Sequence, residues 1–292
     1  MKRDEEGMIL VNVLMFVAIA AGLVLLMINR EELALDRALR TREAARALAV
    51  VRGGELSALV ALRRDAEVAP DIDHVGEPWA RLSEAGARIE GGSFDLAIAD
   101  AEGRFNINAL RSGEVASVIL FQTIATEAGL RPEQMIAAVE YVRLYGPVTD
   151  LRPLRMAGVD PKAAAMLERL VTALPGTTSL NLNAADQEML RILFRDPQVA
   201  ERLAAVRARQ GYLTLKDLTD QNVTMPWGAS FRSNNFWVRT RATIGGTSQQ
   251  AATLIQRRRT ADGLVEVVPV ERWRNAAVPP GAPALPIAAP AS

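Results

Sequence analysis

An uninterrupted apolar run near the start of the chain constrains its fold more than any other feature. The run extends from Met8 to Ile28 and contains one strongly polar residue, Asn12, close to its beginning. A bilayer core of about 30 Å needs about 20 apolar residues in a helix, whereas the apolar part of a secretory signal peptide has about 7–15. A signal peptide would be cut after Ala20, but apolar residues continue through Ile28. The run therefore predicts a membrane-spanning helix.

The residues after this run continue a helical pattern. Residues 30–64 are rich in Ala, Leu, Arg and Glu and contain no proline, a composition with high helix propensity. Apolar side chains such as Leu35 and Leu39 recur at spacings of three and four, as an amphipathic helix requires. Only the pair Gly53-Gly54 interrupts the pattern. We therefore expect one long helix, which spans a membrane over residues 8–29 and packs on a soluble body below; a signal anchor followed by a separate surface helix is the alternative.

Composition and motifs set outer limits on the function. The 292 residues are 49% hydrophobic, which is enough for a sizeable core, and the formal net charge is zero. A neutral chain has no overall attraction to nucleic acid or to anionic lipid. The chain has no cysteine, which excludes disulfides, thiolate metal sites and cysteine nucleophiles. It also contains no GxSxG, GxGxxG, GxxxxGK[ST] or HExxH motif, so no catalytic residues are predicted.

Two polar groups could hold a ligand. His74, the only histidine, follows Asp71 and Asp73; an imidazole and two carboxylates can bind a metal, but a hydrogen-bonded histidine in a surface loop is the stronger interpretation. The triplet Arg257–Arg259 could form a phosphate patch, although three charges near a strand end are more typical of a solvated rim. We therefore predict neither a metal site nor an enzyme, and a hydrolase would need a nucleophile that the sequence does not offer.

The body alternates between strand and helix patterns. Ser93 to Ile98 alternates as a strand, and Glu102 to Arg104 offers a turn. Helical patterns cover 114–128, 133–144, 151–156, 161–174, 184–194 and 197–209, and strand patterns return at 234–246, 250–259 and 264–273. Asn183 is expected to cap the helix that follows it. The order predicts an α+β chain with a helical block between strands of one sheet, followed by a disordered Pro/Ala tail over 276–292.

The amino-terminal residues carry a resemblance. A short charged leader ends at Gly7, and the apolar run begins Met8-Ile9-Leu10-Val11. This arrangement resembles the type IV prepilin-like signal, which a membrane-embedded prepilin peptidase cuts after the glycine, here between Gly7 and Met8. Most pilins have glutamate at the fifth position after that glycine, where this chain has Asn12. In lacking this glutamate the chain resembles the minor pseudopilin K family (GspK) of the type II secretion system, whose members generally lack it too.

Three motifs in the body strengthen the resemblance to the GspK family. DHVGEPWARL (Asp73–Leu82) is similar to the segment before the family's first strand. DAEGRFNINAL (Asp100–Leu110) and TALPGTTSLNLNAADQEML (Thr172–Leu190) are similar to two asparagine-rich stretches of the family. The matching residues singled out in these two stretches are Gly103, Arg104, Phe105, Asn106, Asn108, Asn181 and Asn183. The three motifs follow the family's order and together span most of the chain.

The resemblance implies a type IV pilin-like α+β fold with a long N-terminal transmembrane and stem helix, an antiparallel sheet, and an inserted all-helical domain of helix-hairpin-helix or SAM-like type. The corresponding segments are a leader (1–7), a transmembrane helix (8–29), a stem helix (30–64), the first part of a pilin-like domain (65–130), the helical insertion (131–228), the C-terminal strands (229–275) and the tail (276–292). Some family members bind calcium through an acidic stretch of the insertion. The matching segment here, Tyr141–Tyr145, lacks those carboxylates, so no metal or other cofactor is expected.

The resemblance also implies a place at the tip of a short periplasmic pseudopilus, in complex with the minor pseudopilins I and J, where the protein helps assembly and secretion across the outer membrane. Other pseudopilus subunits, the inner-membrane secretion platform and prepilin peptidase are further implied partners. Arginines and lysines lie on both sides of the anchor, so their distribution does not orient it. The orientation therefore comes from the resemblance, which implies a single-pass inner-membrane anchor with a periplasmic body. Partners are expected to bind the flank of the stem, around Leu39, Leu48, Val51, Leu56 and Leu59.

The helical block leaves a DNA-binding function open. Met156–Leu170 and Leu180–Leu218 look like helix-hairpin-helix units, which often bind phosphate at a helix N-terminus. Here Asp160 follows the hairpin residues Gly158-Val159 and would repel a phosphate, with only Lys162 to offset it. A DNA-binding module normally has a basic face, whereas this chain is neutral. A membrane-tethered DNA-uptake protein therefore stays as the alternative, and no nucleic-acid partner is expected.

The four asparagines of the two motifs are expected to be structural rather than catalytic. In each motif the asparagines lie two residues apart, Asn106 with Asn108 and Asn181 with Asn183. Residues two apart in an extended segment share a face, so each pair should point to one side while the apolar residue between them points to the other. Because an amide is both donor and acceptor, we expect these side chains to close turns and to cap the helices that follow.

Overall fold

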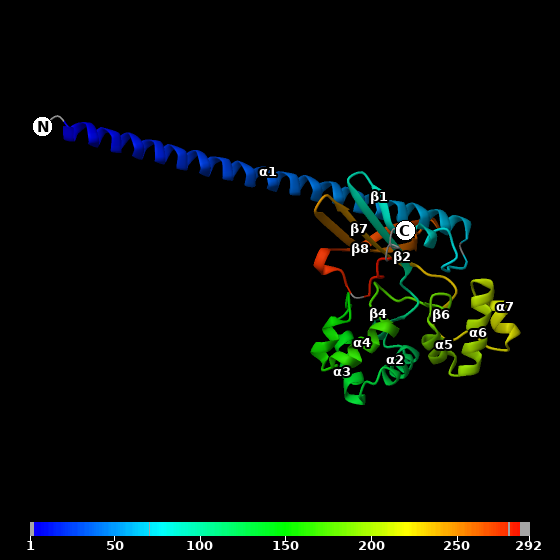
Figure 1. Cartoon of the computed structure of the whole chain (residues 1–292). Coiled ribbons are helices and arrows are strands. Elements are labelled where there is room, and N and C mark those ends of the chain that lie inside the picture. The colour runs from blue at the N-terminus through cyan, green and yellow to red at the C-terminus, as the bar shows by residue number, and fades with distance from the viewer. Residues whose placement is uncertain (1–2, 70, 280, 287–292) are drawn as a thin grey trace.

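The longest element is one helix, α1 (Arg3–Val68, 66 residues), in a computed structural model that describes residues 3–69, 71–279 and 281–286. The helix passes through Gly53-Gly54 without a break, because the flanking Ala, Leu, Arg and Glu residues favour helix and no proline intervenes. The expected long helix is confirmed, and the separate surface helix is wrong. The first two residues of the expected leader lie outside the described residues. Figure 1 shows that the N-terminal part of α1 projects alone from the body.

The body is built on a five-stranded antiparallel sheet with the order β1-β2-β7-β8-β9. Its strands are β1 (Glu84–Ile89), β2 (Gly92–Asp100), β7 (Asn235–Ile244), β8 (Thr247–Arg259) and β9 (Val265–Arg274). The neighbours β2 and β7 are far apart in the sequence, and their register pairs Gly92 with Ile244 and Asp100 with Phe236. Everything between these two strands is therefore an insertion at one end of the sheet.

The second half of α1 packs on one face of this sheet. Its buried stripe repeats at spacings of three and four, as a helix face requires; the stripe comprises Ala47, Val51, Gly54, Ala58 and Leu62. Most of these side chains are small, so the helix backbone lies close to the strands. At Gly54 an added Cβ would lie only 2.6 Å from Cζ of Phe94. The glycine that weakens helix propensity is thus the residue that permits the close approach.

Side chains from the strands alternate between two apolar layers, as the pleat requires. Phe236 and Val238 of β7 pack with Leu62 in the layer under α1. Trp237, between them, belongs to a layer on the opposite face, together with Leu254. Both faces of the sheet are therefore covered, although the helix covers only one.

The described part of the Pro/Ala tail helps to cover the opposite face. Ala282 is buried there, the backbone O of Gly281 accepts a hydrogen bond from Arg104 Nη2 at 3.0 Å, and the O of Pro283 accepts one from Arg239 Nη1 at 3.1 Å. The expected disorder over 276–292 is therefore wrong for 276–279 and 281–286, while residue 280 and residues 287–292 lie outside the described residues. Composition alone did not predict this packing, because the donors come from distant parts of the sequence.

The insertion is mainly helical and lies on the side of the sheet away from α1 (Figure 1). Its helices are α2 (Val115–Glu127), α3 (Pro132–Tyr145), α4 (Pro161–Leu170), α5 (Gln187–Phe194), α6 (Pro197–Gln210) and α7 (Leu215–Asp220). Two short parallel ladders join them, β3 (Phe105–Asn106) with β4 (Val171–Thr172) and β5 (Leu180–Asn181) with β6 (Ala229–Ser230). Single 3₁₀ turns η1 to η4 occupy Ala80–Leu82, Ile107–Ser112, Arg152–Ala157 and Asn275–Ala277.

Three details of the insertion differ from the sequence prediction. The block shares one core that already includes Phe121 and Ile124 of α2, so it begins after β2 rather than at residue 131. The helix expected over 161–174 ends at Leu170, because the next two residues pair with β3. Helix α5 begins at Gln187, where Oδ1 of Asp186 accepts a hydrogen bond from Met189 N at 2.7 Å. Asp186 is therefore the N-cap in place of Asn183.

Candidate functional site

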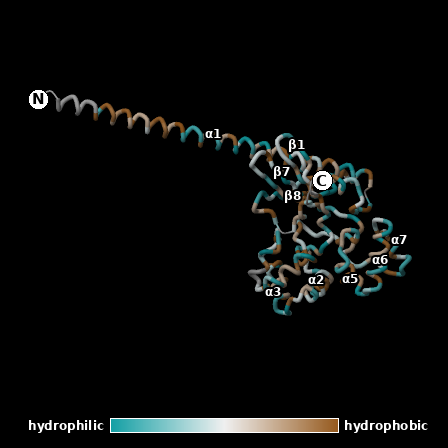
Figure 2. Tube along the Cα trace, in the orientation of Figure 1, coloured by the Kyte–Doolittle hydropathy of each residue, from teal (hydrophilic) through white to brown (hydrophobic). Residues whose placement is uncertain are grey.

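The N-terminal part of α1 has no protein cover. Every residue from 11 to 42 is exposed, including large apolar side chains such as Phe16 (67%) and Leu26 (66%). Figure 2 shows the part of this stretch farther from the body as mainly hydrophobic, while hydrophilic segments alternate with hydrophobic ones closer to the body. Among the described residues, α1 is the one helix long and apolar enough to cross a membrane. A bare apolar surface of this extent marks a membrane or protein interface, and Asn12 lies exposed within it.

Where α1 reaches the body, an apolar groove runs along its free flank. The groove encloses about 760 Å³, and its walls include Leu56, Val60, Val68, Pro78 and Leu82. Leu56 and Val60 are 60% and 66% exposed, although both lie on the packed half of the helix. The groove therefore leaves apolar side chains uncovered beside the sheet.

The residues expected on the stem flank divide between the core and the surface. Val51 is buried against the sheet, Leu48 and Leu59 are half-buried, and Leu39 and Leu56 are exposed. One edge of the predicted apolar stripe on α1 thus packs against the sheet, while the other edge is exposed.

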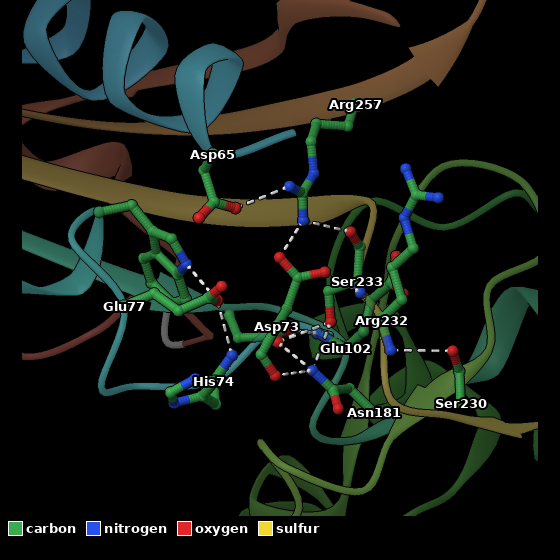
Figure 3. Close-up of polar contacts among 12 residues, drawn as sticks. Asp65, Asp73, His74, Glu77, Glu102, Asn181, Ser230, Arg232, Ser233 and Arg257 are labelled. Carbon is green, nitrogen blue, oxygen red and sulfur yellow. Dashed lines mark hydrogen bonds and ion pairs between the residues drawn. The ribbon is translucent and has the colours of Figure 1, made fainter. Parts of the chain in front are cut away.

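A buried guanidinium joins the end of α1 to three other segments. Arg257 of β8 is 2% exposed, and its Nη1 donates to Oδ2 of Asp65 at 2.9 Å. Its Nη2 donates to Asp73 Oδ1 and, at 2.8 Å, to the backbone O of Ser233 (Figure 3). The guanidinium also lies 4.6 Å from the ring centroid of Phe236. Because a buried charge is stable only when it is paired and hydrogen-bonded, these contacts fix the stem end, the loop after it and the segment before β7.

Three carboxylates surround this arginine. Oxygens of Asp65, Asp73 and Glu77 lie within 4.8 Å of one another. Burial, together with the neighbouring Glu77, raises the pKa of Asp65 to about 7 against the effect of Arg257. Glu77 Oε2 accepts hydrogen bonds from His74 N and from the indole nitrogen of Trp79, both at 2.9 Å. Each carboxylate thus already has protein donors, which makes the cluster an ion-pair network rather than a set of free metal ligands.

The structure separates His74 from its predicted carboxylate partners. Its Nδ1 accepts a hydrogen bond from Gly76 N at 3.1 Å, and its ring stacks on Tyr212 with 4.7 Å between centroids. Asp73 is directed to Arg257 instead, and Asp71 is exposed. Asp71, Asp73 and His74 therefore do not converge.

The helical block meets the sheet through further buried polar groups. The Nδ2 of Asn181 lies 3.0 Å from the backbone O of Asp73, 2.8 Å from Oδ2 of Asp100 and 3.0 Å from Oγ of Ser233. Ser233 Oγ also donates to Asp100 Oδ2 at 2.6 Å. Burial raises the pKa of Asp100 to about 6, although the Ser233 and Asn181 hydrogen bonds oppose the shift. This network holds the chain where it leaves the sheet and where it returns.

Glu102 completes the network. It is fully buried, its Oε1 accepts a hydrogen bond from Asn235 Nδ2 at 2.6 Å, and burial raises its pKa to about 8. We call this set the polar junction, which comprises Asp65, Asp73, Asp100, Glu102, Asn181, Ser233, Asn235 and Arg257.

The DAEGRFNINAL motif holds distant loops in place. Asn106 and Asn108 both donate from Nδ2 to the backbone O of Leu174, at 3.3 and 2.9 Å. At Gly103 an added Cβ would lie 2.4 Å from the backbone O of Ala184. Arg104 Nη1 donates to the backbone O of Glu168 at 2.9 Å. Phe105 is buried beside these groups, with 4% exposed.

The second asparagine motif makes equally remote contacts. Asn183 pairs with the backbone of Leu213 through both ends of its amide, accepting from N at 2.6 Å and donating to O at 3.2 Å. The two α-helices have other caps: α2 begins at Val115 after Glu114, which makes no side-chain cap bond, and Asp186 caps α5. The expected capping of α2 and α5 is therefore wrong. The expected closing of turns is confirmed, since Asn106 Oδ1 accepts from Asn108 N at 3.2 Å, as the N-cap of the 3₁₀ helix Ile107–Ser112, and Asn181 Oδ1 accepts from Asn183 N at 2.9 Å.

Acidic caps fill the helix N-termini of the block. Asp160 Oδ1 accepts from Lys162 N at 3.1 Å and from Ala163 N at 3.0 Å. Asp186 and Asp196 occupy the same position on α5 and α6. A phosphate bound at a helix N-terminus needs those N–H groups and an absence of negative charge. The geometry therefore does not favour the helix-hairpin-helix mode of DNA binding.

Sequence reasoning missed most of the polar junction. Arg257 was grouped with Arg258 and Arg259 as a solvated rim, but only the latter two are exposed. The alternation of β8 could have shown that Arg257 faces inward, since Ile255 lies two residues before it and is also buried.

No family model matches the chain. Type II secretion system protein K of Pseudomonas aeruginosa is 26% identical over 92% of this chain and 93% of its own length. The protein of the same name from Klebsiella pneumoniae is 24% identical over 91% of this chain and 97% of its own length. A chain of the crystal structure of the GspK-GspI-GspJ complex from the type 2 secretion system of enterotoxigenic Escherichia coli matches with a TM-score of 0.62 and 19% identity, over 82% of this chain and 99% of that chain. The fold is thus the pilin-like α+β fold with an inserted helical domain.

Proposed function

The chain belongs to the type II secretion system protein K family, whose members are minor pseudopilins, and we propose that it acts at the tip of the periplasmic pseudopilus. The observation that carries the proposal is the division of α1 into a bare apolar part and a part that packs on the sheet. Before assembly, the bare part would lie in the membrane, where lipid covers its apolar surface. After assembly, it would lie among the packed helices of other subunits in the filament, which cover the same surface. Acidic caps in the helical block count against the DNA-uptake alternative.

The minor pseudopilins I and J are the proposed direct partners. Support comes from the similar chain in the GspK-GspI-GspJ complex and from the groove beside Leu56 and Val60. Interfaces draw most of their affinity from a few buried apolar anchors, and these exposed side chains are suited to that role. Other pseudopilus subunits, the inner-membrane secretion platform and prepilin peptidase are the further proposed partners.

Asn12 fits a tip position. In a pilus, a buried carboxylate at this position of each subunit is thought to meet the amino terminus of a neighbouring subunit, and a buried charge needs such a partner. A subunit at the tip has no neighbour above it. Asn12 is polar but uncharged, so it avoids the energetic penalty of an unpaired charge.

The proposed location is the inner membrane, crossed once by α1, with the body in the periplasm. Cleavage by prepilin peptidase between Gly7 and Met8 would give a mature protein that begins at Met8. Amino-terminal sequencing of membrane-extracted protein tests this, and a start at Met1 or after Ala20 contradicts it. The variant Gly7→Val should leave the precursor uncut, because a pocket that fits glycine has no room for a side chain.

The role is structural rather than enzymatic, and it needs no cofactor or metal. The experiment is to delete the gene in its host and to measure export of the proteins that the host secretes by this route. Secreted proteins should accumulate in the periplasm and return to the medium when the full chain is restored. Unchanged export after deletion, in a host whose other secretion components are shown to be required, contradicts the proposal.

A further inference from the structure

A polar cavity lies where the helical block joins the sheet. It encloses about 420 Å³ between Glu102 after β2, the loop Thr177-Thr178, the residues Arg232, Asn234 and Asn235 around the start of β7, and the end of β8. Exposed residues of this lining, Asn234, Arg258 and Arg259, form its solvent side. The cavity borders the polar junction through Glu102 and Arg257, which belong to both (Figure 3).

Unpaired buried polar atoms gather at this cavity. Among the described residues, six buried side-chain atoms have no hydrogen-bond partner: Glu102 Oε2, Thr178 Oγ1, Arg232 Nε, Trp237 Nε1, Arg239 Nε and Arg257 Nε. Four of these six belong to residues that line the cavity, namely Glu102, Thr178, Arg232 and Arg257. Such atoms are rare in folded proteins because each one loses its hydrogen bonds to water without replacement. Their concentration at one cavity means that their partners, whether water or a polar ligand, would lie in that cavity.

The other polar atoms of the two most buried residues are already engaged, which leaves one free atom on each. The two terminal nitrogens of Arg257 bind Asp65, Asp73 and the backbone of Ser233, so Nε is left over. Oε1 of Glu102 accepts from Asn235, so Oε2 is left over. Arg257 is 2% exposed and Glu102 is fully buried, so neither free atom has bulk water as a partner.

The four atoms share one chemical character, since each can donate a hydrogen bond. Two are guanidinium N–H groups and one is a hydroxyl. Burial and the nearby Asp100 and Asp73 raise the pKa of Glu102 to about 8, although its bond from Asn235 opposes the shift. The charged groups that line the cavity with Glu102 are Arg232, Arg257, Arg258 and Arg259. Because Oε1 accepts from Asn235, Oε2 is the atom on which Glu102 would retain a proton at neutral pH.

We propose that this cavity binds a small oxyanion, a phosphate or a carboxylate, through Arg232 Nε, Arg257 Nε, Thr178 Oγ1 and Glu102 Oε2. Unpaired buried donors along the wall of one cavity match an acceptor-only ligand, and charge-assisted hydrogen bonds to oxyanions are the strong ones. The positive charge is in excess here, because Arg257 and Arg258 are paired with carboxylates while Arg232 has no ion pair among the described residues. The bound anion would hold the two connections of the helical block in one arrangement.

The geometry favours a soluble anion over a lipid headgroup. The cavity is lined by residues of the body, and the bare apolar segment of α1 projects away from the body (Figure 1). Residues 30–64 of the helix separate the two, and a rise of 1.5 Å per residue makes that distance roughly 50 Å. A lipid headgroup at the membrane surface does not reach so far.

The experiment is calorimetric titration of the full chain in detergent with sodium phosphate, sodium acetate and sodium citrate at pH 7, against sodium chloride at equal ionic strength. We expect saturable binding of at least one oxyanion and none of chloride; comparing phosphate with the two carboxylates identifies the preferred class. Arg232→Met and Thr178→Val should each weaken that binding about tenfold, since each removes one donor to a charged ligand. Arg169→Met and Thr123→Val, which lie outside the cavity, are the controls.

Glu102→Gln separates a ligand contact from a purely structural role. Its amide can accept from Asn235 and still donate into the cavity, so binding at pH 7 should persist. Binding by the wild type should weaken between pH 7 and pH 9 as Glu102 loses its proton, whereas this variant should not show that loss. Equal binding of chloride and all three oxyanions overturns the proposal. Unchanged oxyanion affinity in Arg232→Met and Thr178→Val, with native circular dichroism, overturns it as well.

Discussion

The contact between α1 and the sheet differs in kind from the contact between the helical block and the sheet. The first uses small apolar residues such as Ala47, Gly54 and Ala58. The second uses buried charges and amides, with Asn181, Asp100 and Glu102 at its centre. The same network reaches the end of α1 through the buried pair of Asp65 and Arg257. Apolar burial is non-directional and tolerates changes that conserve volume. A polar network instead depends on every member, because removal of one leaves its partners buried and unpaired.

Arg257→Met should have the largest effect and would break the polar junction. The change leaves Asp65 and Asp73 without their shared cation, which should lower the free energy of unfolding by about 3–5 kcal/mol. Denaturant unfolding of the full chain in detergent measures the loss. Arg258→Met is the matched control, because its pair with Glu266 is exposed and should contribute less than about 1 kcal/mol. Equal stability of the two variants contradicts a structural role for the buried arginine.

Leu62→Ala tests the apolar contact. Leu62 of α1 is fully buried between the helix and the sheet. Truncation of a buried leucine to alanine typically lowers the free energy of unfolding by about 2–4 kcal/mol, through lost burial and a residual cavity. Leu56→Ala, on the same helix but 60% exposed, should change stability by less than about 0.5 kcal/mol. Similar losses at the two positions would mean that α1 packs on the sheet in a different rotation.

Asn183→Ala should have a smaller effect, confined to the helical block. The change removes both hydrogen bonds to Leu213 and leaves a buried N–H and C=O unpaired, at a cost of about 1–3 kcal/mol. The thermal midpoint should fall while affinity for partners by the folded chain stays the same. Gln122→Ala, an exposed amide on α2, is the control. Unchanged melting with lost function would contradict the structural interpretation of these asparagines.

The pH dependence of stability should be the smallest effect and should come mainly from the polar junction. Burial also raises the pKa of Glu77, which adds to the effect, and lowers the pKa of His74, which opposes it. The pKa values of Glu102, Asp65 and Asp100 are raised to about 8, 7 and 6. Between about pH 4 and pH 8 the folded chain therefore holds protons that the unfolded chain has released, so the free energy of unfolding falls as the pH rises. We expect a decrease of about 1 kcal/mol or more, seen as a thermal midpoint several degrees lower at pH 8 than at pH 5.

Glu102→Gln should flatten this pH dependence, since its side chain does not titrate and fills the same volume. Leu62→Ala should lower stability equally at every pH, because the apolar contact carries no proton. Glu266→Gln, at the exposed pair with Arg258, serves as the control. An unchanged slope in Glu102→Gln would place the proton uptake on other groups.

Much of the apolar architecture could be predicted from the sequence. The continuous run from Met8 and the proline-free stem predicted α1, and alternating residues predicted the strands, because both signals are local. The register of the stem was harder: the buried stripe includes Gly54 and Ala58, which contribute little hydrophobicity, while the larger Leu56 is exposed. Small residues are buried there because the backbone of α1 lies close to the strands. The local sequence pattern does not predict the distance between helix and sheet.

The polar junction could not be predicted in the same way. Asn181 lies 108 residues from Asp73, and Ser233 lies 160 residues from it. A single amide or carboxylate gives no periodic signal, and its partner is chosen by the tertiary fold. The motifs singled out the asparagines as structural residues. Reasoning from the local sequence, however, predicted that they cap the nearest helices. Besides the turns that Asn106 and Asn181 close, the hydrogen bonds of these asparagines connect loops that the fold brings together.

Association of the full chain with the minor pseudopilins I and J tests the central claim most directly. Mixed in detergent at micromolar concentrations, the three proteins should form a stable complex. Leu56→Arg should weaken it about tenfold or more by placing a charge in the apolar groove, whereas Leu215→Arg, at a leucine of α7 that is also 60% exposed, should leave it unchanged. A folded wild-type chain that forms no complex with either partner would contradict the account.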